Sequence, residues 1–178
     1  YGMRSIDDEA PRGYSLFAKK KTFRQALLNQ GFDVLEIDLE KGIPGDVNIL
    51  TIADMREPFT LEEESVLAEY IAKGGNIYIL GEPRRRDVMN PILKKYFGIQ
   101  LMEGTLVQYR LDWLQPIFLK SMITPEARDL SFYYGLAYNV LLPTTAGLEQ
   151  VEDKGFNVIP VLTSDTIVAE LGPDRQNR

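Results

Sequence analysis

Several carboxylates follow the apolar stretches of this sequence, where they could carry out acid–base chemistry. Asp54 directly follows one apolar run, Glu82 follows another after Gly81, and Asp87 comes five residues later. Glu82 with either aspartate could act as a general acid and a general base, because one carboxyl group can give a proton while the other takes one. Acidic residues at such positions also serve as salt-bridge partners or helix caps, and that role stays open as the alternative.

Three consecutive arginines, Arg84, Arg85 and Arg86, form the second group. A planar guanidinium can bind a phosphate or a carboxylate through two parallel hydrogen bonds, so these residues could hold an anion. The nearby glycines match neither a phosphate-binding loop nor a dinucleotide-binding fingerprint. A solvated or partner-facing loop is the alternative, because runs of charge most often lie in water.

The chain of 178 residues contains no histidine and no cysteine. Nucleophilic catalysis that needs an imidazole base or a thiolate is therefore excluded, as are disulfides and metal sites built from these side chains. A net charge of −6 and a pI near 4.8 also make general attraction to nucleic acid unexpected. We expect a protein that is not an enzyme, with no cofactor, no metal ion and no nucleic-acid partner.

The secondary structure expected around these residues alternates between helices and strands. Thr60 and Glu63 have the spacing of a capping box that begins a helix, and Gly74 ends it. Asn90 and Pro91 are expected to begin a short helix that ends at Gly98. Strands are expected at 32–39, 47–53 and 76–80, and further strands at 105–111, 115–121, 138–142, 147–153 and 156–164, with a short helix at 124–130.

This alternation predicts an α/β fold: a doubly wound, mostly parallel sheet of flavodoxin-like type, with a β-rich C-terminal half. Residues 1–14 are expected to be a lead-in loop, 15–171 a single domain, and 172–178 a polar tail of a longer, membrane-anchored protein. Aromatic residues at 113–118 and 131–138 suit either a core or an interface.

Ligands of such a sheet gather beyond the carboxyl ends of its strands. A strand that ends in a tight glycine turn before a helix is also the geometry of a nucleophile elbow, here without its nucleophile and base. The expected ligand- or partner-binding residues are Asp54, Arg56, Gly81, Glu82, Arg84, Arg85 and Arg86.

The stretch "FTLEEESVLAEYIAKGGNIYILGEP" resembles the class I glutamine amidotransferase-like domains. The order of the later stretches "GIQ", "MITPEARDLS", "LLPTTAGLEQ" and "PVLTSDTIVAE" is similar to that of auxiliary domains of ABC-2 type transporters of the gliding-motility type. The resemblance covers roughly residues 32–171. A related carbohydrate-associated family places histidine near the elbow, where this chain has Gly81 and Glu82.

The resemblance implies a non-catalytic, extracytoplasmic (periplasmic) binding domain of an inner-membrane protein. Its partners would be an ABC permease and ATPase or other envelope proteins. Two alternatives stay open: a hydrolase or carbohydrate-associated enzyme that uses its carboxylates, and a sensor of small anions that uses its arginines.

Overall fold

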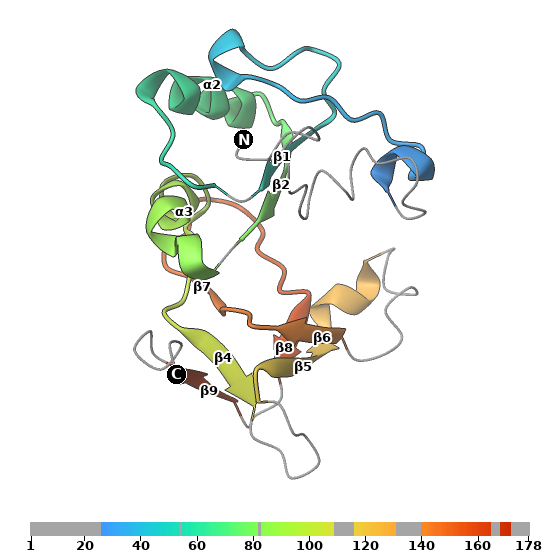
Figure 1. Ribbon diagram of the computed structural model, residues 1–178, viewed down its shortest axis with the longest axis vertical. Coiled ribbons are helices and arrows are strands. Elements are labelled where there is room, and N and C mark those ends of the chain that lie inside the picture. Colours follow the sequence, from blue (N-terminus) through green and yellow to red (C-terminus); the bar gives the residue numbers. More distant parts are fainter. Residues whose placement is uncertain are drawn as a thin grey trace, which may run out of the picture. The chain divides into compact units, whose positions relative to one another are not determined.

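The computed structural model describes residues 26–53, 55–81, 83–108, 116–130, 140–164 and 168–171 (Figure 1). The chain divides into two compact units, Tyr1–Gly81 and Glu82–Arg178. The expected lead-in loop, the polar tail and the aromatic stretch 131–138 lie outside the described residues. The single domain expected over 15–171 stays a prediction.

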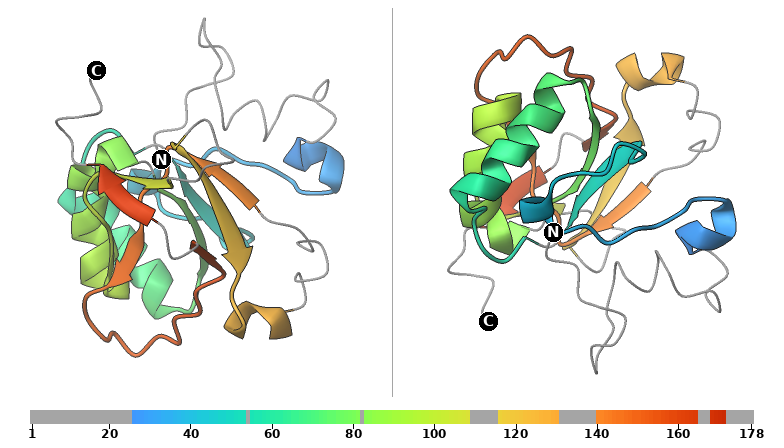
Figure 2. Two further views of the ribbon diagram at one scale, coloured as in Figure 1. Left: turned by 90° about the horizontal axis from the view of Figure 1, so that it is seen from below. Right: turned by 90° about the horizontal axis from the view of Figure 1, so that it is seen from above.

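A parallel pair of strands forms the centre of the first unit. β1 (Ile49–Ala53) pairs with β2 (Asn76–Leu80), and Ala53 lies opposite Leu80 at the carboxyl ends. The crossover between them contains α2 (Leu61–Ala72), which lies alongside the pair in Figures 1 and 2. Leu50 and Ile52 of β1 are buried, as is Leu67 of α2. A strand, helix and parallel strand are therefore confirmed in this part of the chain.

The capping box at the start of α2 is also confirmed. The hydroxyl oxygen of Thr60 accepts a hydrogen bond of 3.2 Å from the backbone N–H of Glu63. The Glu63 carboxylate in turn accepts one of 2.8 Å from the backbone N–H of Thr60. Two N–H groups that the helix cannot satisfy are thereby paired. At the other end, Gly74 takes the positive φ of 77° that ends the helix.

The segment before β1 departs from the expected strand at 32–39. Residues 32–38 form no strand, and Leu39 begins the short 3-10 helix η2 (Leu39–Lys41). A further 3-10 turn, η1 (Leu27–Gln30), precedes them. Of the apolar residues that suggested a strand, Phe32 is 51% exposed and Val34 and Ile37 are half-buried, whereas Leu39 is buried as the first residue of η2.

The second unit begins with a helix and continues with short strands. η3 (Pro83–Arg85) leads into α3 (Arg86–Ile92), which widens into the π-helical turn η4 (Leu93–Phe97). The strands are β3 (Ile99–Leu101), β4 (Thr105–Gln108), β5 (Phe118–Ile123), β6 (Val140–Pro143), β7 (Leu148–Gln150), β8 (Leu162–Ser164) and β9 (Val168–Leu171). One more 3-10 turn, η5 (Glu126–Asp129), follows β5.

All strand pairs described in the second unit are antiparallel. β3 pairs with β7, β4 pairs with β9, and β5 lies between β6 and β8. The side chain of the fully buried Gln108 adds a link between β4 and β5, because its oxygen accepts a hydrogen bond from the backbone N–H of Lys120. Within the described ranges, no helix has both the length and the apolar composition needed to cross a bilayer.

The expected doubly wound, mostly parallel sheet of flavodoxin-like or amidotransferase-like type is therefore wrong. β1 and β2 are the one parallel pair in the described part of the chain. That part has two α-helices, and no crossover helices separate the short strands after β4. Antiparallel strands need no such crossover, so the second half can pair its strands through turns and long loops.

Candidate functional site

Two of the expected site residues, Asp54 and Glu82, lie outside the described residues. Arg56 and Gly81 lie in the first unit, and both are exposed. The parallel register places the ends of β1 and β2 side by side, so the chain leaves both strands at the same edge of the pair.

The three arginines lie in the second unit and differ in their surroundings. Arg84 is exposed and Arg85 is partly exposed, both within η3. Arg86 is the first residue of α3, and only 19% of its side chain is exposed. Of the three, Arg86 lines a pocket.

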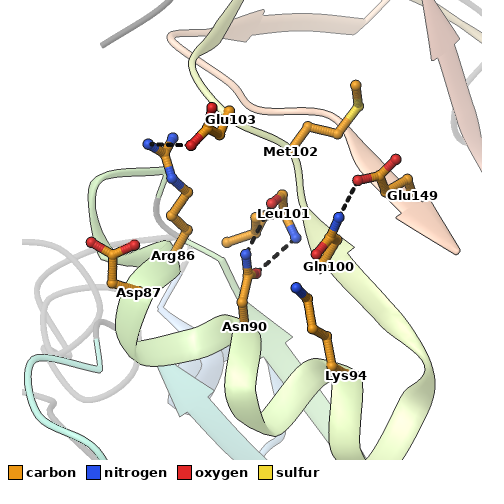
Figure 3. Close-up of a pocket in the computed structure, with 9 residues that line it drawn as sticks. All are labelled: Arg86, Asp87, Asn90, Lys94, Gln100, Leu101, Met102, Glu103 and Glu149. Atoms are coloured by element: carbon orange, nitrogen blue, oxygen red, sulfur yellow. Dashed lines mark hydrogen bonds and ion pairs between the residues drawn. The ribbon is translucent and has the colours of Figure 1, made fainter. Parts of the chain in front are cut away.

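This pocket lies between α3 with its π-helical extension and the strand β3 (Figure 3). It encloses about 380 Å³ and is open to solvent. The helix contributes Arg86, Asp87, Asn90 and Lys94, and the other side is formed by Gln100, Leu101, Met102, Glu103 and Glu149. Arg86, Asn90 and Lys94 are spaced four residues apart, which places them in one row along a helix.

Asn90 fixes the distance between the two sides of the pocket. Its side-chain N–H donates a hydrogen bond of 3.1 Å to the carbonyl of Leu101, and its side-chain oxygen accepts one of 2.9 Å from the N–H of Leu101. Backbone bonds join β3 to β7 at alternate residues only. The flanking bonds link Gly98 to Val151 and Met102 to Gly147, so the residues two apart in this register face β7. The backbone groups of Leu101 therefore point away from β7, and the amide of Asn90 takes the place of a neighbouring strand.

Charged groups of opposite sign face one another across the pocket. The guanidinium of Arg86 lies 3.9 Å from the carboxylate of Glu103, whose side chain is 78% exposed. Farther along, Lys94 points into the pocket from the helix side, and Glu149 accepts a hydrogen bond from Gln100 on the strand side (Figure 3). An ion pair as long as that of Arg86 and Glu103 leaves hydrogen-bonding capacity on both groups.

The helix that carries this row begins earlier than expected. Asn90 and Pro91 were expected at its start, but they lie inside it, and α3 begins at Arg86. Pro91 has no N–H and cannot bond to the carbonyl of Asp87. The helix widens to π geometry directly after Ile92 and ends as expected at Gly98, whose φ is 67°.

Of the nine residues that line the pocket, Arg86 was among the expected binding residues, and Asp87 was considered only for acid–base chemistry. The other seven were not expected: Asn90, Lys94, Gln100, Leu101, Met102, Glu103 and Glu149. The row of Arg86, Asn90 and Lys94 would have been visible in the sequence had the helix been placed from Arg86. Glu149 reaches the pocket because β3 pairs with β7. In this pairing Gln100 lies opposite Glu149, which is 49 residues later in the sequence. No local sequence pattern predicts the pairing of β3 with β7.

Comparison with known proteins gives one structural likeness. No protein-family description matches the chain, and no curated protein matches it. A solved structure described as "mmIFT52 N-terminal domain" is similar with a TM-score of 0.60 and 24% sequence identity. The match covers 83% of this chain and 71% of that one. It is a likeness of fold, and this fold replaces the expected doubly wound sheet.

Proposed function

We propose that the chain is a non-catalytic binding module and that the pocket beside α3 recognises a peptide segment with one acidic and one basic side chain. The observation that carries this proposal is the opposition of charges across the pocket. Arg86 and Lys94 lie on the helix side, and Glu103 and Glu149 lie on the strand side. A ligand with a single charge would be repelled by one side as it is attracted to the other.

The spacing of the charges sets the length of the ligand. Arg86 and Lys94 are eight residues apart on a continuous helix, which corresponds to roughly 12 Å along its axis. A single amino acid is too short to contact both ends, whereas a short peptide is long enough. Asn90 lies midway between them in the sequence, and its two bonds to Leu101 hold the two walls of the pocket at a fixed distance before any ligand binds.

Binding fits this pocket better than catalysis by its carboxylates. Asp87, Glu103 and Glu149 are all exposed to solvent. Carboxylates that act as acid and base work best in sites from which water is excluded. The exposed positions favour charge recognition, which is strongest where partner groups displace the remaining water.

Our proposal for the larger protein to which this module belongs rests on the sequence motifs and not on the fold. On that basis the module belongs to the extracytoplasmic part of an ABC-2 type transporter auxiliary protein, and the peptide belongs to a permease or another envelope protein. Coexpression with the permease and ATPase subunits of an ABC-2 type transporter from the same organism tests this setting. Retention of both subunits through two purification steps supports it, and purification of the module alone contradicts it.

A capped tripeptide tests the pocket. The probe is Glu-Ala-Lys, acetylated and amidated so that only its side chains are charged, and binding is followed by changes in the NMR shifts of backbone amides. We expect changes at the residues that line the pocket. Replacing either charged residue of the probe with glutamine should weaken binding at least about tenfold, which corresponds to about 1.4 kcal/mol.

Matched variants locate the effect. Lys94→Met and Glu149→Gln should each abolish the preference for the charged probe, while Lys95→Met should retain it. Lys95 is the neighbour of Lys94 but lies over the ring of Tyr96 and does not line the pocket. Equal binding of all three probes, or equal losses in Lys94→Met and Lys95→Met, would contradict the proposal.

A further inference from the structure

The chain between β7 and β8 forms a long exposed segment. All residues from 151 to 160 are exposed, and in both views of Figure 2 this part of the second unit loops outwards from the elements around it. Four of its side chains are large and apolar: Val151, Phe156, Val158 and Ile159 are 47%, 48%, 43% and 36% exposed. Large apolar side chains gathered on one exposed segment are typical of a protein-binding surface.

The segment is held at both ends. Before it, the carbonyl of Gly98 accepts hydrogen bonds from the N–H groups of Val151 and Glu152, at 2.8 and 3.1 Å. The ring of Phe156 lies 5.8 Å from the ring of Phe97. After it, Thr124 donates through its N–H to the carbonyl of Val161 and through its hydroxyl to that of Pro160. The position of the segment between these ends therefore does not depend on pairing along the segment itself.

The middle of the segment has no hydrogen-bonding partner in the described chain. Asn157, Val158 and Ile159 lie in neither a helix nor a strand, and none of their backbone groups bonds to any of the described residues. When such a run is extended against another chain, its unpaired N–H and C=O groups can pair as those at the edge of a sheet do. Another chain can add to such an edge as a strand, with backbone bonds giving affinity and alternate side chains giving specificity.

We propose that residues 156–159 bind an extended segment of a partner protein, which pairs with them as a β-strand. The proposal goes beyond the binding of a charged peptide in the pocket and does not rest on it. Pro160 has no N–H, so the pairing ends there. Apolar side chains at alternate positions of the partner would cover Phe156 and Val158, which lie on the same side of an extended chain.

Charge favours a basic partner over a second copy of this chain. Glu149, Glu152 and Asp153 precede residues 156–159, and Lys154 is already paired with Glu152 at 2.7 Å. The whole chain carries a net charge of −6, so two copies repel one another as they approach. A partner strand with lysine or arginine at its ends would be attracted instead.

Hydrogen–deuterium exchange with a designed peptide tests the proposal. The probe is a capped peptide, Lys-Val-Thr-Val-Thr-Val-Lys, and the control is the same peptide with alternate backbone nitrogens methylated. In the free chain the amides of Asn157, Val158 and Ile159 should exchange rapidly, because they are unbonded. The probe should slow their exchange at least about tenfold, and the methylated peptide should not.

Two variants separate strand pairing from contact of side chains. Val158→Pro removes an N–H that bonds to no described residue, so we expect its melting temperature to stay near that of the parent chain and its binding of the probe to be lost. Val158→Ala keeps the N–H and should retain binding with lower affinity.

Four outcomes would overturn the proposal. The first is slow exchange of these amides in the dilute free chain, because the segment would then be covered already. The second is protection that grows with protein concentration without peptide, which would make a second copy the occupant. The third is equal binding of the methylated peptide, which would mean apolar docking without pairing. The last is an absence of protection at millimolar probe.

Discussion

The side-chain amide of Asn90 forms hydrogen bonds with both backbone groups of Leu101. A single side chain on α3 thereby satisfies the donor and the acceptor that Leu101 presents away from β7. The helix and the strand are joined by this pair without a further strand between them. The width of the pocket depends on the same two bonds, because they span it from one wall to the other.

Replacing Asn90 with alanine should destabilise the second unit. Both backbone groups of Leu101 would lose their partner in a partly buried position, at a cost of roughly 1 to 3 kcal/mol in the free energy of unfolding. Urea denaturation measures this loss. Asn90→Asp keeps the acceptor for the N–H of Leu101 and should cost less. A chain with Asn90→Ala that unfolds at the same urea concentration as the parent would contradict the role assigned to Asn90.

Gly98 should tolerate alanine much less well than Gly155. Both have positive φ, at 67° and 78°, so either substitution costs roughly 1 to 2 kcal/mol in backbone strain. A side chain at Gly98 would also collide with the carbonyl oxygen of Glu152, whereas nothing lies within 4 Å of one at Gly155. Thermal unfolding should therefore show a clearly larger loss for Gly98→Ala. Equal melting temperatures would mean that the backbone at Gly98 moves freely.

The capping box of α2 gives a prediction for the first unit. Thr60→Ala removes the acceptor for the N–H of Glu63 and should lower the free energy of unfolding by about 1 kcal/mol. Glu63→Gln can still accept from the N–H of Thr60 and should cost less. Glu62→Gln, in the same first turn but exposed, is the control. Chemical denaturation followed by helical circular dichroism ranks the three, and a loss for Glu62→Gln as large as that for Thr60→Ala would count against the box.

The pKa of Asp38 should respond to Lys41. A hydrogen bond from Lys41, 3.0 Å away, lowers the pKa of the Asp38 carboxyl below its ordinary value of 3.8, and a bond from the N–H of Glu40 adds to this. Since the pKa is lowered by folding, the small stabilisation is present above the ordinary value and is lost as the pH falls through the folded one. Carboxyl NMR titration should show Lys41→Met raising the pKa of Asp38.

Glu69 serves as the internal reference for that titration. Its pKa is also lowered, by a hydrogen bond from Lys73 on the same helix, and it should not change in Lys41→Met. A shift of equal size in both carboxyls would point to a general change of charge rather than to the pair. Both pairs are exposed, so 1 M salt should weaken the two shifts together.

The elements that sequence reasoning located correctly are those specified by neighbouring residues. The capping box of Thr60 and Glu63 and the glycine that ends α2 act within one turn, and the parallel pairing of β1 and β2 follows from the helix between them. The pairing of the later strands is different, because Gln100 meets Glu149 across a long stretch of chain. Alternation of apolar residues indicates a strand but not its direction or its partner.

The candidate site also combines local features that the sequence predicts with tertiary contacts that it does not. The three arginines were recognised as a group, yet Arg86 alone lines the pocket, because α3 begins at that residue and turns it towards β3. Asn90 has the sequence features of a helix cap, and Pro91 those of a first-turn residue, but tertiary contact with Leu101 places both inside the helix. Local preference was overridden there by a partner eleven residues away.

The backbone of Gly98 has a mechanical consequence for any partner that pulls on residues 156–159. Its N–H is bonded to the carbonyls of Leu93 and Lys94 at the start of η4, and its carbonyl is bonded to both Val151 and Glu152. Tension applied to the segment is shared by these two carbonyl bonds before it reaches the helix, and bonds loaded together resist force better than bonds that break one after another. The two bonds that hold the start of the segment would therefore also resist a pulling force exerted by a bound partner.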